Sequence, residues 1–115
     1  MIDVTGKRLF LIGVPDREKF KAAEVGLYEI GARYVLNPLE FFEDAKGVED
    51  YNRKLFHVLT YQQSWDYLVL LDGWNHDTFQ LLVHQVAGHC GIQACSLHDL
   101  NRKALYRFWG VGDAE

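Results

Sequence analysis

The chain has 115 residues, of which 49% are hydrophobic and 14% aromatic, and its formal net charge is −4. This length suits one domain over residues 1–115, and so apolar a composition excludes a disordered chain, because burial of that surface offsets the loss of conformational entropy. The Lys and Arg residues are dispersed in an acidic chain, so we expect no track for a nucleic acid.

The first part of the chain predicts a strand followed by a helix. Residues 7–13 read KRLFLIG, a short apolar run that ends in glycine, which is typical of a strand buried on both faces. We expect Asp16 to cap the helix that follows and Gly31 to end it in a left-handed conformation. The apolar residues of this helix have helical spacing and are Phe20, Ala23, Leu27 and Ile30.

A second short strand is predicted at residues 33–36, which read RYVL. The pair Asn37-Pro38 ends it, because proline cannot continue a ladder and restricts the residue before it. We expect a loop from there to about Gly47, and then a second helix. The apolar side of this helix consists of Tyr51, Leu55, Val58 and Leu59, with Trp65 as a further candidate.

The clearest buried strand is predicted at residues 66–71, which read DYLVLL and run directly into the loop DGWNHD at 72–77. We expect a third helix to begin at Asp77 and to end at Gly91. Its predicted core-facing residues, at i, i+3, i+4, i+7, i+8 and i+11, are Phe79, Leu82, Val83, Val86, Ala87 and Cys90.

The last part of the chain predicts a strand at 92–96, a short helix at 97–105 and a strand or docked tail at 106–111. Strands that alternate with helices along the chain indicate a parallel sheet covered on both faces. The fold class is therefore expected to be α/β.

The cysteines and histidines show no pattern of a metal site. Cys90 and Cys95 form neither a CxxC pair nor half of a repeated ligand pattern, and the five-residue step from His84 to His89 would place them on different faces of a helix. No apolar stretch approaches the roughly 20 residues of a membrane helix, and no signal peptide is recognisable. We expect a cytoplasmic protein with reduced cysteines, no metal and no cofactor.

A ligand site is expected where the strand order reverses, because open parallel sheets bind ligands beyond the carboxyl ends of their strands at that point. If the order is 2-1-3-4, this point lies between the first and third strands. The loops there hold glycines for close approach, an aromatic ring for stacking and polar groups for orientation. The candidate ligand-binding residues are Gly13, Val14, Pro15, Asp16, Gly73, Trp74, Asn75, His76 and Asp77.

Several of these candidates also have a purely structural interpretation. Asp77 either bonds to the edge of a base or caps its helix. Asp72 is either an acid whose pKa is raised by partial burial or a loop carboxylate bonded to backbone amides. Trp74 either stacks on a ligand or partner, or covers the edge of the sheet. Arg17 and Lys19 either meet a phosphate at the start of the first helix or are surface charges.

Several short motifs in fixed order carry a family resemblance. They are LFLIGVP, Phe20 with Ala22-Ala23, Gly31, Asn37-Pro38, DYLVLLDGW and Gly91-Ile92. Over residues 7 to 96 the chain resembles short bacterial and phage proteins related to nucleoside 2-deoxyribosyltransferases. The resemblance implies a flavodoxin-like three-layer sandwich with a mostly parallel sheet of four or five strands, order 2-1-3-4(-5). It also implies a nucleoside or nucleotide pocket and a homodimer or higher homo-oligomer.

The same resemblance implies that the usual nucleophile is absent. In active relatives, a glutamate six residues after a Ser or Asp on the third helix attacks the anomeric carbon and forms a glycosyl-enzyme ester. Here Asp77 matches the Ser or Asp, and Val83 matches the glutamate. Phe79-Gln80 replaces a step of small residues, and Phe10 stands where many relatives have tyrosine.

Three hypotheses for the function follow. The first is a nucleoside- or nucleotide-binding protein that is catalytically altered or inactive. The second is an oligomeric interaction or scaffold protein, whose interface would contain Trp74, Phe79, Tyr106, Phe108 and Trp109. The third is an N-glycosidase or deoxyribosyltransferase in which Asp72 or Asp77 is the acid or the water-activating base.

Overall fold

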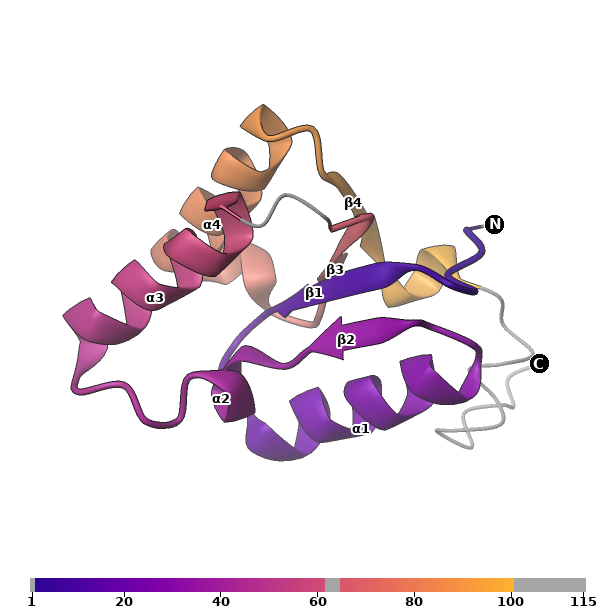
Figure 1. The fold of residues 1–115 in the computed structure, drawn as a ribbon, viewed down its shortest axis with the longest axis horizontal. Helices are drawn as coiled ribbons and strands as arrows, with labels where there is room; N and C mark the ends of the chain where they lie inside the picture. The colour runs from indigo at the N-terminus through magenta and orange to yellow at the C-terminus, as the bar shows by residue number, and fades with distance from the viewer. Residues whose placement is uncertain (1, 62–64, 101–115) are drawn as a thin grey trace.

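The structure of the protein, a computed structural model, describes residues 2–61 and 65–100 (Figure 1). Its elements in chain order are β1 (Arg8–Ile12), α1 (Arg17–Glu29), β2 (Tyr34–Leu36), α2 (Pro38–Phe41), α3 (Val48–Tyr61), β3 (Tyr67–Leu70), the 3-10 helix η1 (Trp74–His76), α4 (Thr78–His89), β4 (Gln93–Ser96) and the 3-10 helix η2 (Leu97–Asp99). The predicted segment at 106–111, and the predicted helix at 97–105 beyond Leu100, lie outside the described residues.

The described strands form one parallel sheet in the order β2-β1-β3-β4. In its register, Leu9 of β1 pairs with Val35 on one side and with Tyr67 on the other. The predicted α/β class and the order 2-1-3-4 are therefore confirmed. The order reverses between β1 and β3, so the switch point lies where the sequence predicts it.

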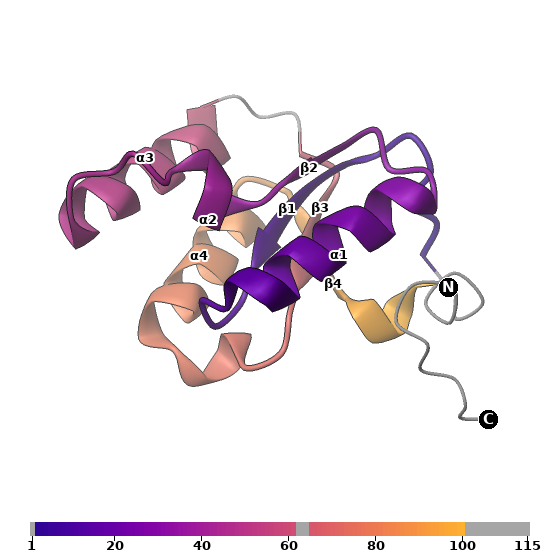
Figure 2. The ribbon, with the colours of Figure 1, turned by 90° about the horizontal axis from the view of Figure 1, so that it is seen from below.

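The sheet lies between two helical layers, with α1 on one face and α3 and α4 on the other (Figures 1 and 2). Successive side chains of β1 point to opposite faces of the sheet, so this strand contributes to the core on each face. Leu9 and Leu11 belong to the core that α1 covers, whereas Phe10 and Ile12 belong to the core under α3 and α4. No helix within the described ranges combines the length and the apolar character needed to cross a membrane.

Helix α1 has the caps that its sequence predicts. The carboxylate of Asp16 accepts hydrogen bonds from the amides of Glu18 and Lys19, both at 3.1 Å. Gly31 follows the helix with φ 106°, a conformation that other residues rarely adopt. Three of its four predicted core residues, Phe20, Ala23 and Leu27, are buried, and Ile30 is half-buried.

The segment after β2 differs from the predicted loop, because it contains the short helix α2. The Asn37 side chain accepts a hydrogen bond from the Leu39 amide at 3.1 Å, and Pro38 occupies the first turn, where its missing N–H costs nothing. The prediction of a continuous loop is wrong for these four residues.

Helix α3 buries Leu55 and Leu59, as its periodicity predicts. Trp65 lies beyond the end of the helix, but it is buried too, and its indole Nε1 donates a hydrogen bond to the Val58 carbonyl at 3.2 Å. This tryptophan therefore joins the start of β3 to α3.

Helix α4 turns most of its predicted face to the core, since Phe79 and Val86 also pack against it, but two of the predicted residues are exposed. Val83 and Ala87 are fully buried as expected, but Leu82 is 47% exposed and Cys90 is also exposed. Gln80 is buried in their place. The helix carries apolar residues on several faces, so periodicity alone does not single out the one that packs.

Candidate functional site

The loops after β1 and β3 lie against each other at the carboxyl edge of the sheet. The Leu71 amide donates a hydrogen bond to the Ile12 carbonyl at 2.8 Å. A Cβ on Gly13 would lie 2.7 Å from Cβ of Leu71, and a Cβ on Gly73 would lie 2.6 Å from Cγ2 of Val14. Gly73 also has φ 79°. Both loops therefore approach as closely as they do only because these two positions carry no side chain.

Gln80 connects α4 to the first of these loops, and the sequence analysis did not identify it as a site residue. Its side-chain Oε1 accepts a hydrogen bond from the Gly13 amide at 3.2 Å, and the residue is 7% exposed. A buried amide must find such a partner. The signal in the sequence is a single polar residue among apolar ones at the start of a helix.

The amides at the starts of α1 and α4 are already bonded to carboxylates. Asp16 caps α1, and Asp77 Oδ1 accepts hydrogen bonds from the amides of Phe79 at 2.8 Å and Gln80 at 3.4 Å. The structural interpretation of Asp77 as a helix cap is thus observed. Because a negative side chain sits at each helix start, these ends of α1 and α4 do not attract a phosphate.

The surface around the two loops is partly apolar and partly polar. Val14 and Pro15 are exposed on the first loop, and Asp72, Asn75 and His76 are exposed on the second. The partial burial expected for Asp72 is therefore not observed. These five residues form an open surface, here called the switch-point surface, that offers hydrogen-bonding groups beside an apolar side chain.

Trp74 and Phe79, two of the aromatic residues predicted at an interface, each make an aromatic contact within the chain. Trp74 is half-buried, and its ring centroid lies 4.8 Å from that of His84 on α4. Phe79 is half-buried and meets Phe56 of α3 edge to face at 5.5 Å. Tyr106, Phe108 and Trp109, which complete that predicted interface, lie outside the described residues.

Val83 is the residue that the resemblance places at the nucleophile position. Its side chain is 0% exposed and belongs to the same buried cluster as Phe10 and Ile12. It therefore contributes to the core under α3 and α4, and it is not part of the switch-point surface.

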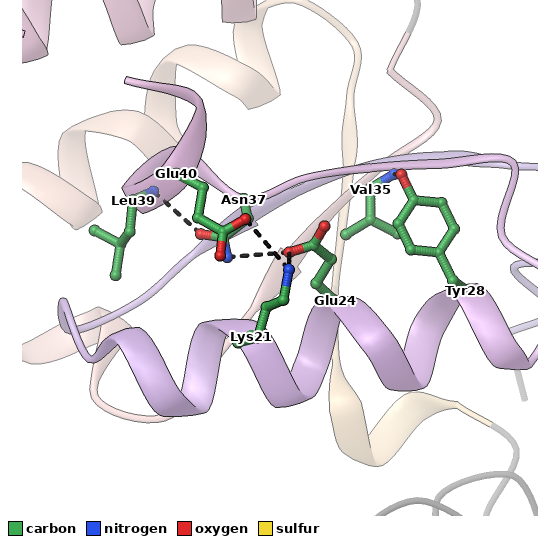
Figure 3. Close-up of polar contacts among 7 residues, drawn as sticks. All are labelled: Lys21, Glu24, Tyr28, Val35, Asn37, Leu39 and Glu40. Atoms are coloured by element: carbon green, nitrogen blue, oxygen red, sulfur yellow. Dashed lines mark hydrogen bonds and ion pairs between the residues drawn. The ribbon is translucent and has the colours of Figure 1, made fainter. Parts of the chain in front are cut away.

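A second polar group lies at the carboxyl end of β2 (Figure 3). Asn37 is 4% exposed, and its Nδ2 donates a hydrogen bond to Glu24 at 3.2 Å. Lys21 lies 3.5 Å from Glu24 and 3.3 Å from Glu40. These polar groups satisfy one another and join α1 to α2.

The free edge of β2 is closed by the same helix (Figure 3). The Val35 amide donates a hydrogen bond to the Tyr28 hydroxyl at 3.0 Å. An edge amide that is bonded in this way cannot recruit a strand from another chain. Like the Asn37 group, this contact holds the fold together and leaves no group for a ligand.

Two adjoining cavities lie beside α3, and no pattern in the sequence predicted them. One has a volume of about 360 Å³ and lies between the start of β2 and α3, with Arg8, Arg33, Tyr34 and Trp65 among its lining residues. The other has about 450 Å³ and lies between α2 and α3. They share Phe41 and Val58, so they adjoin.

Within residues 2–61 and 65–100, no three His, Cys, Asp or Glu side chains form a group suited to a metal ion.

Comparisons of the chain with known protein families, with curated proteins and with solved structures found no match. The resemblance to nucleoside 2-deoxyribosyltransferases therefore stays a prediction. The support for a ligand site is the geometry of the loops after β1 and β3.

Proposed function

We propose that this protein binds an uncharged, nucleoside-type ligand at the switch-point surface and forms no covalent bond with it. The observation that carries the proposal is the contact of the two loops beyond β1 and β3, at the point where the strand order reverses. Asn75 and His76 provide hydrogen-bonding groups for a base or a sugar, and Val14 provides an apolar contact.

The charges at the helix starts favour a nucleoside over a nucleotide. Phosphates bind at helix N-termini because free amides and the helix dipole attract them. In this protein, Asp16 and Asp77 already use the first amides of α1 and α4, and each adds a negative charge there. A phosphate at this surface would meet the carboxylates of both caps and of Asp72, and the exposed Arg17 and Lys19 would offset this charge only at the start of α1.

Two residues support a function without covalent chemistry, Val83 at the position of the nucleophile and Asp77 at the start of α4. Val83 offers no nucleophilic atom and is fully buried. Asp77, one of the two aspartates considered as acid or base, accepts two amide hydrogen bonds through Oδ1 as the cap of α4. These contacts keep its carboxylate directed to the backbone of its own helix.

Thermal unfolding with added nucleosides tests the proposal. A nucleoside present at a hundred times its dissociation constant should stabilise the protein by about 2.7 kcal/mol, whereas the matching 5′-monophosphate should have a smaller effect. Asn75→Ala and His76→Ala should remove the shift, and His89→Ala, at the exposed far end of α4, should retain it. The proposal fails if no nucleoside shifts the transition or if monophosphates bind more tightly.

The same samples distinguish binding from catalysis. Chromatography after incubation should show intact nucleoside, because the position that the resemblance assigns to the nucleophile is the buried hydrocarbon side chain of Val83. Release of free base that is lost in Asp77→Asn would instead identify an N-glycosidase that uses the cap residue.

A scaffold function is the second candidate, and two exposed apolar residues on α4 favour it. Leu81 and Leu82 are consecutive residues of α4 and are 44% and 47% exposed. Apolar surface of this kind is commonly covered when subunits associate. Light scattering should then show an oligomer that dissociates in Leu81→Ser/Leu82→Ser but not in Val48→Ser, where the leucines remain. A monomeric wild type would rule this function out for the protein alone.

A further inference from the structure

The cavity of about 360 Å³ lies at the opposite end of the sheet from the switch-point surface. Arg8 is the first residue of β1, Tyr34 is the first residue of β2, and Trp65 precedes β3. Because these strands are parallel, their amino ends meet at one edge. The cavity extends from this edge along β2 and is bounded by Val58 of α3. A ligand there would be separate from one bound beyond the carboxyl ends.

Arg8 lines this cavity with a guanidinium group for which residues 2–61 and 65–100 provide no hydrogen-bond acceptor. Its guanidinium carbon lies 5.5 Å from the centroid of the Tyr34 ring and 5.2 Å from that of Trp65. The Nε atom is buried and makes no hydrogen bond. The rings make cation–π contacts with the guanidinium group, but they do not replace the hydrogen bond that the buried Nε atom has lost.

No carboxylate of the described residues pairs with Arg8 or with its neighbour Arg33. The ion pairs between described residues are formed by Lys21, Arg53 and Lys54. Asp66 lies nearby, but its Oδ2 accepts a hydrogen bond from the Arg8 backbone amide at 2.9 Å. Two arginines that form no ion pair with a described carboxylate therefore line one small cavity in a chain of net charge −4.

The other walls of the cavity suit a ring. The Tyr34 and Trp65 rings are stacked, with centroids 5.9 Å apart and planes 28° apart. Trp65 is fixed by its bond to the Val58 carbonyl and by edge-to-face contact with Phe10 at 5.2 Å. Burial raises the pKa of the Tyr34 hydroxyl above its ordinary value, so that group carries no negative charge at neutral pH. Phe41, which is 49% exposed, forms an apolar rim.

The adjoining cavity of about 450 Å³ lacks this combination. Its cations are already paired, because Arg53 bonds to Asp50, and Lys54 Nζ lies 3.2 Å from Asp50 Oδ2 and 3.9 Å from Asp44 Oδ1. These charges need no further anion. Of the two cavities, only the one at Arg8 presents uncompensated positive charge.

We propose that the cavity at the amino edge binds a small molecule that consists of a planar ring and one anionic group, a carboxylate or a phosphate. The anion is held by Arg8 and Arg33, whose forked donors suit either group, and the ring lies against Tyr34 and Phe41. The volume suits a compact ligand of this kind. This site does not depend on the proposed nucleoside function, because it uses none of the same residues.

Nuclear magnetic resonance titration with four probes tests the proposal on the intact chain. The probes are benzoate, phenyl phosphate, acetate and benzyl alcohol, and the signals are Arg8 Nε–H and the Trp65 indole N–H. Benzoate or phenyl phosphate should shift both signals, and the tighter of the two identifies the anionic group. Acetate, which lacks the ring, and benzyl alcohol, which lacks the charge, should each bind about tenfold more weakly or worse.

Variants assign the binding to the two arginines. Arg33→Gln removes an exposed charge and should weaken binding about tenfold, and Arg8→Lys, which keeps the charge but loses the fork, should weaken it similarly. Arg17→Gln, on α1 at the other face of the sheet, should bind as the wild type does. If Arg8→Lys does not fold, the affinity of Arg33→Gln for the probes tests the proposal without it.

Three results would overturn the proposal. They are binding of benzyl alcohol as tight as that of benzoate, wild-type affinity in Arg33→Gln, and no shift of either signal with any probe at about 10 mM. None of these results depends on nucleoside binding at the switch-point surface, so the two proposals fail or hold separately.

Discussion

The Gln80 side chain accepts a hydrogen bond from the Gly13 amide, and this contact links two residues that lie 67 positions apart in the chain. Through it, α4 is fixed against the loop that follows β1. The position of the switch-point surface therefore depends on one buried amide as well as on apolar packing.

Gln80→Leu should lower the free energy of unfolding by about 1 to 3 kcal/mol, because it leaves the buried Gly13 amide without an acceptor. Urea unfolding measures this change. Gln85→Leu is the matched control on the same helix, because Gln85 is exposed and its replacement should change stability little. Equal effects of the two substitutions would show that the hydrogen bond contributes nothing.

Gly73→Ala should destabilise the protein more than Gly47→Ala. Both glycines have positive φ, 79° and 96°, so alanine strains the backbone at each by roughly 1 to 2 kcal/mol. Only at position 73 does the new Cβ also collide with Val14, and this overlap should add about 1 to 3 kcal/mol. Thermal unfolding of the two variants measures the difference.

A double variant isolates the contact between the loops. Val14→Ala removes the methyl group that lies 2.6 Å from the added Cβ, while Cβ of residue 14 stays at an ordinary 3.5 Å. Val14→Ala should therefore recover most of the extra loss in Gly73→Ala. If it recovers none, the loops are not in contact in solution.

Val83→Glu should destabilise the fold strongly and should not restore glycosyl transfer. The side chain is 0% exposed among apolar residues, so an uncompensated charge there costs roughly 3 to 5 kcal/mol. Urea unfolding and chromatography of nucleosides measure the two outcomes. Gln85→Glu introduces the same charge at an exposed position of α4 and should be tolerated. A stable Val83→Glu that releases base would mean that this position faces the ligand.

The two cysteines should differ in reactivity. Burial, with a contribution from Asp99, raises the pKa of the Cys95 thiol to about 12, whereas Cys90 is exposed. Iodoacetamide at pH 8 should therefore modify Cys90 at least about a hundredfold faster than Cys95, because only the accessible thiolate reacts. Mass spectrometry after timed quenching measures both rates, and equal rates would show that β4 opens readily.

The raised pKa of Cys95 also sets a pH dependence with a definite sign. Below pH 9, the ordinary value for this thiol, it is protonated in both states and stability does not depend on it. As the pH rises from 9 towards 12, the unfolded state loses this proton first, so the free energy of unfolding falls. Cys95→Ala should reduce this slope, and Cys90→Ala should not.

The sequence by itself determined the elements whose signals are local. The apolar run of β1, the cap Asp16 and the positive-φ Gly31 each act within a few residues, and they sufficed to place β1, α1 and β2. The alternation of strands and helices likewise indicated a parallel sheet, and the order 2-1-3-4 was confirmed. Given that order, the switch-point rule predicted that the loops after β1 and β3 are neighbours, and in the structure the Leu71 amide bonds to the Ile12 carbonyl.

Only the tertiary structure decided which faces and cavities these elements form. Periodicity identified Val83 and Ala87 as buried residues of α4, but the burial of Gln80 depends on its hydrogen bond with the Gly13 amide, which only the tertiary structure brings within reach. The cavity at the amino edge joins Arg8 to Trp65 from distant parts of the chain. The sequence around Arg8 does not indicate Trp65 as its neighbour, because burial and charge compensation depend on the tertiary packing of the whole domain.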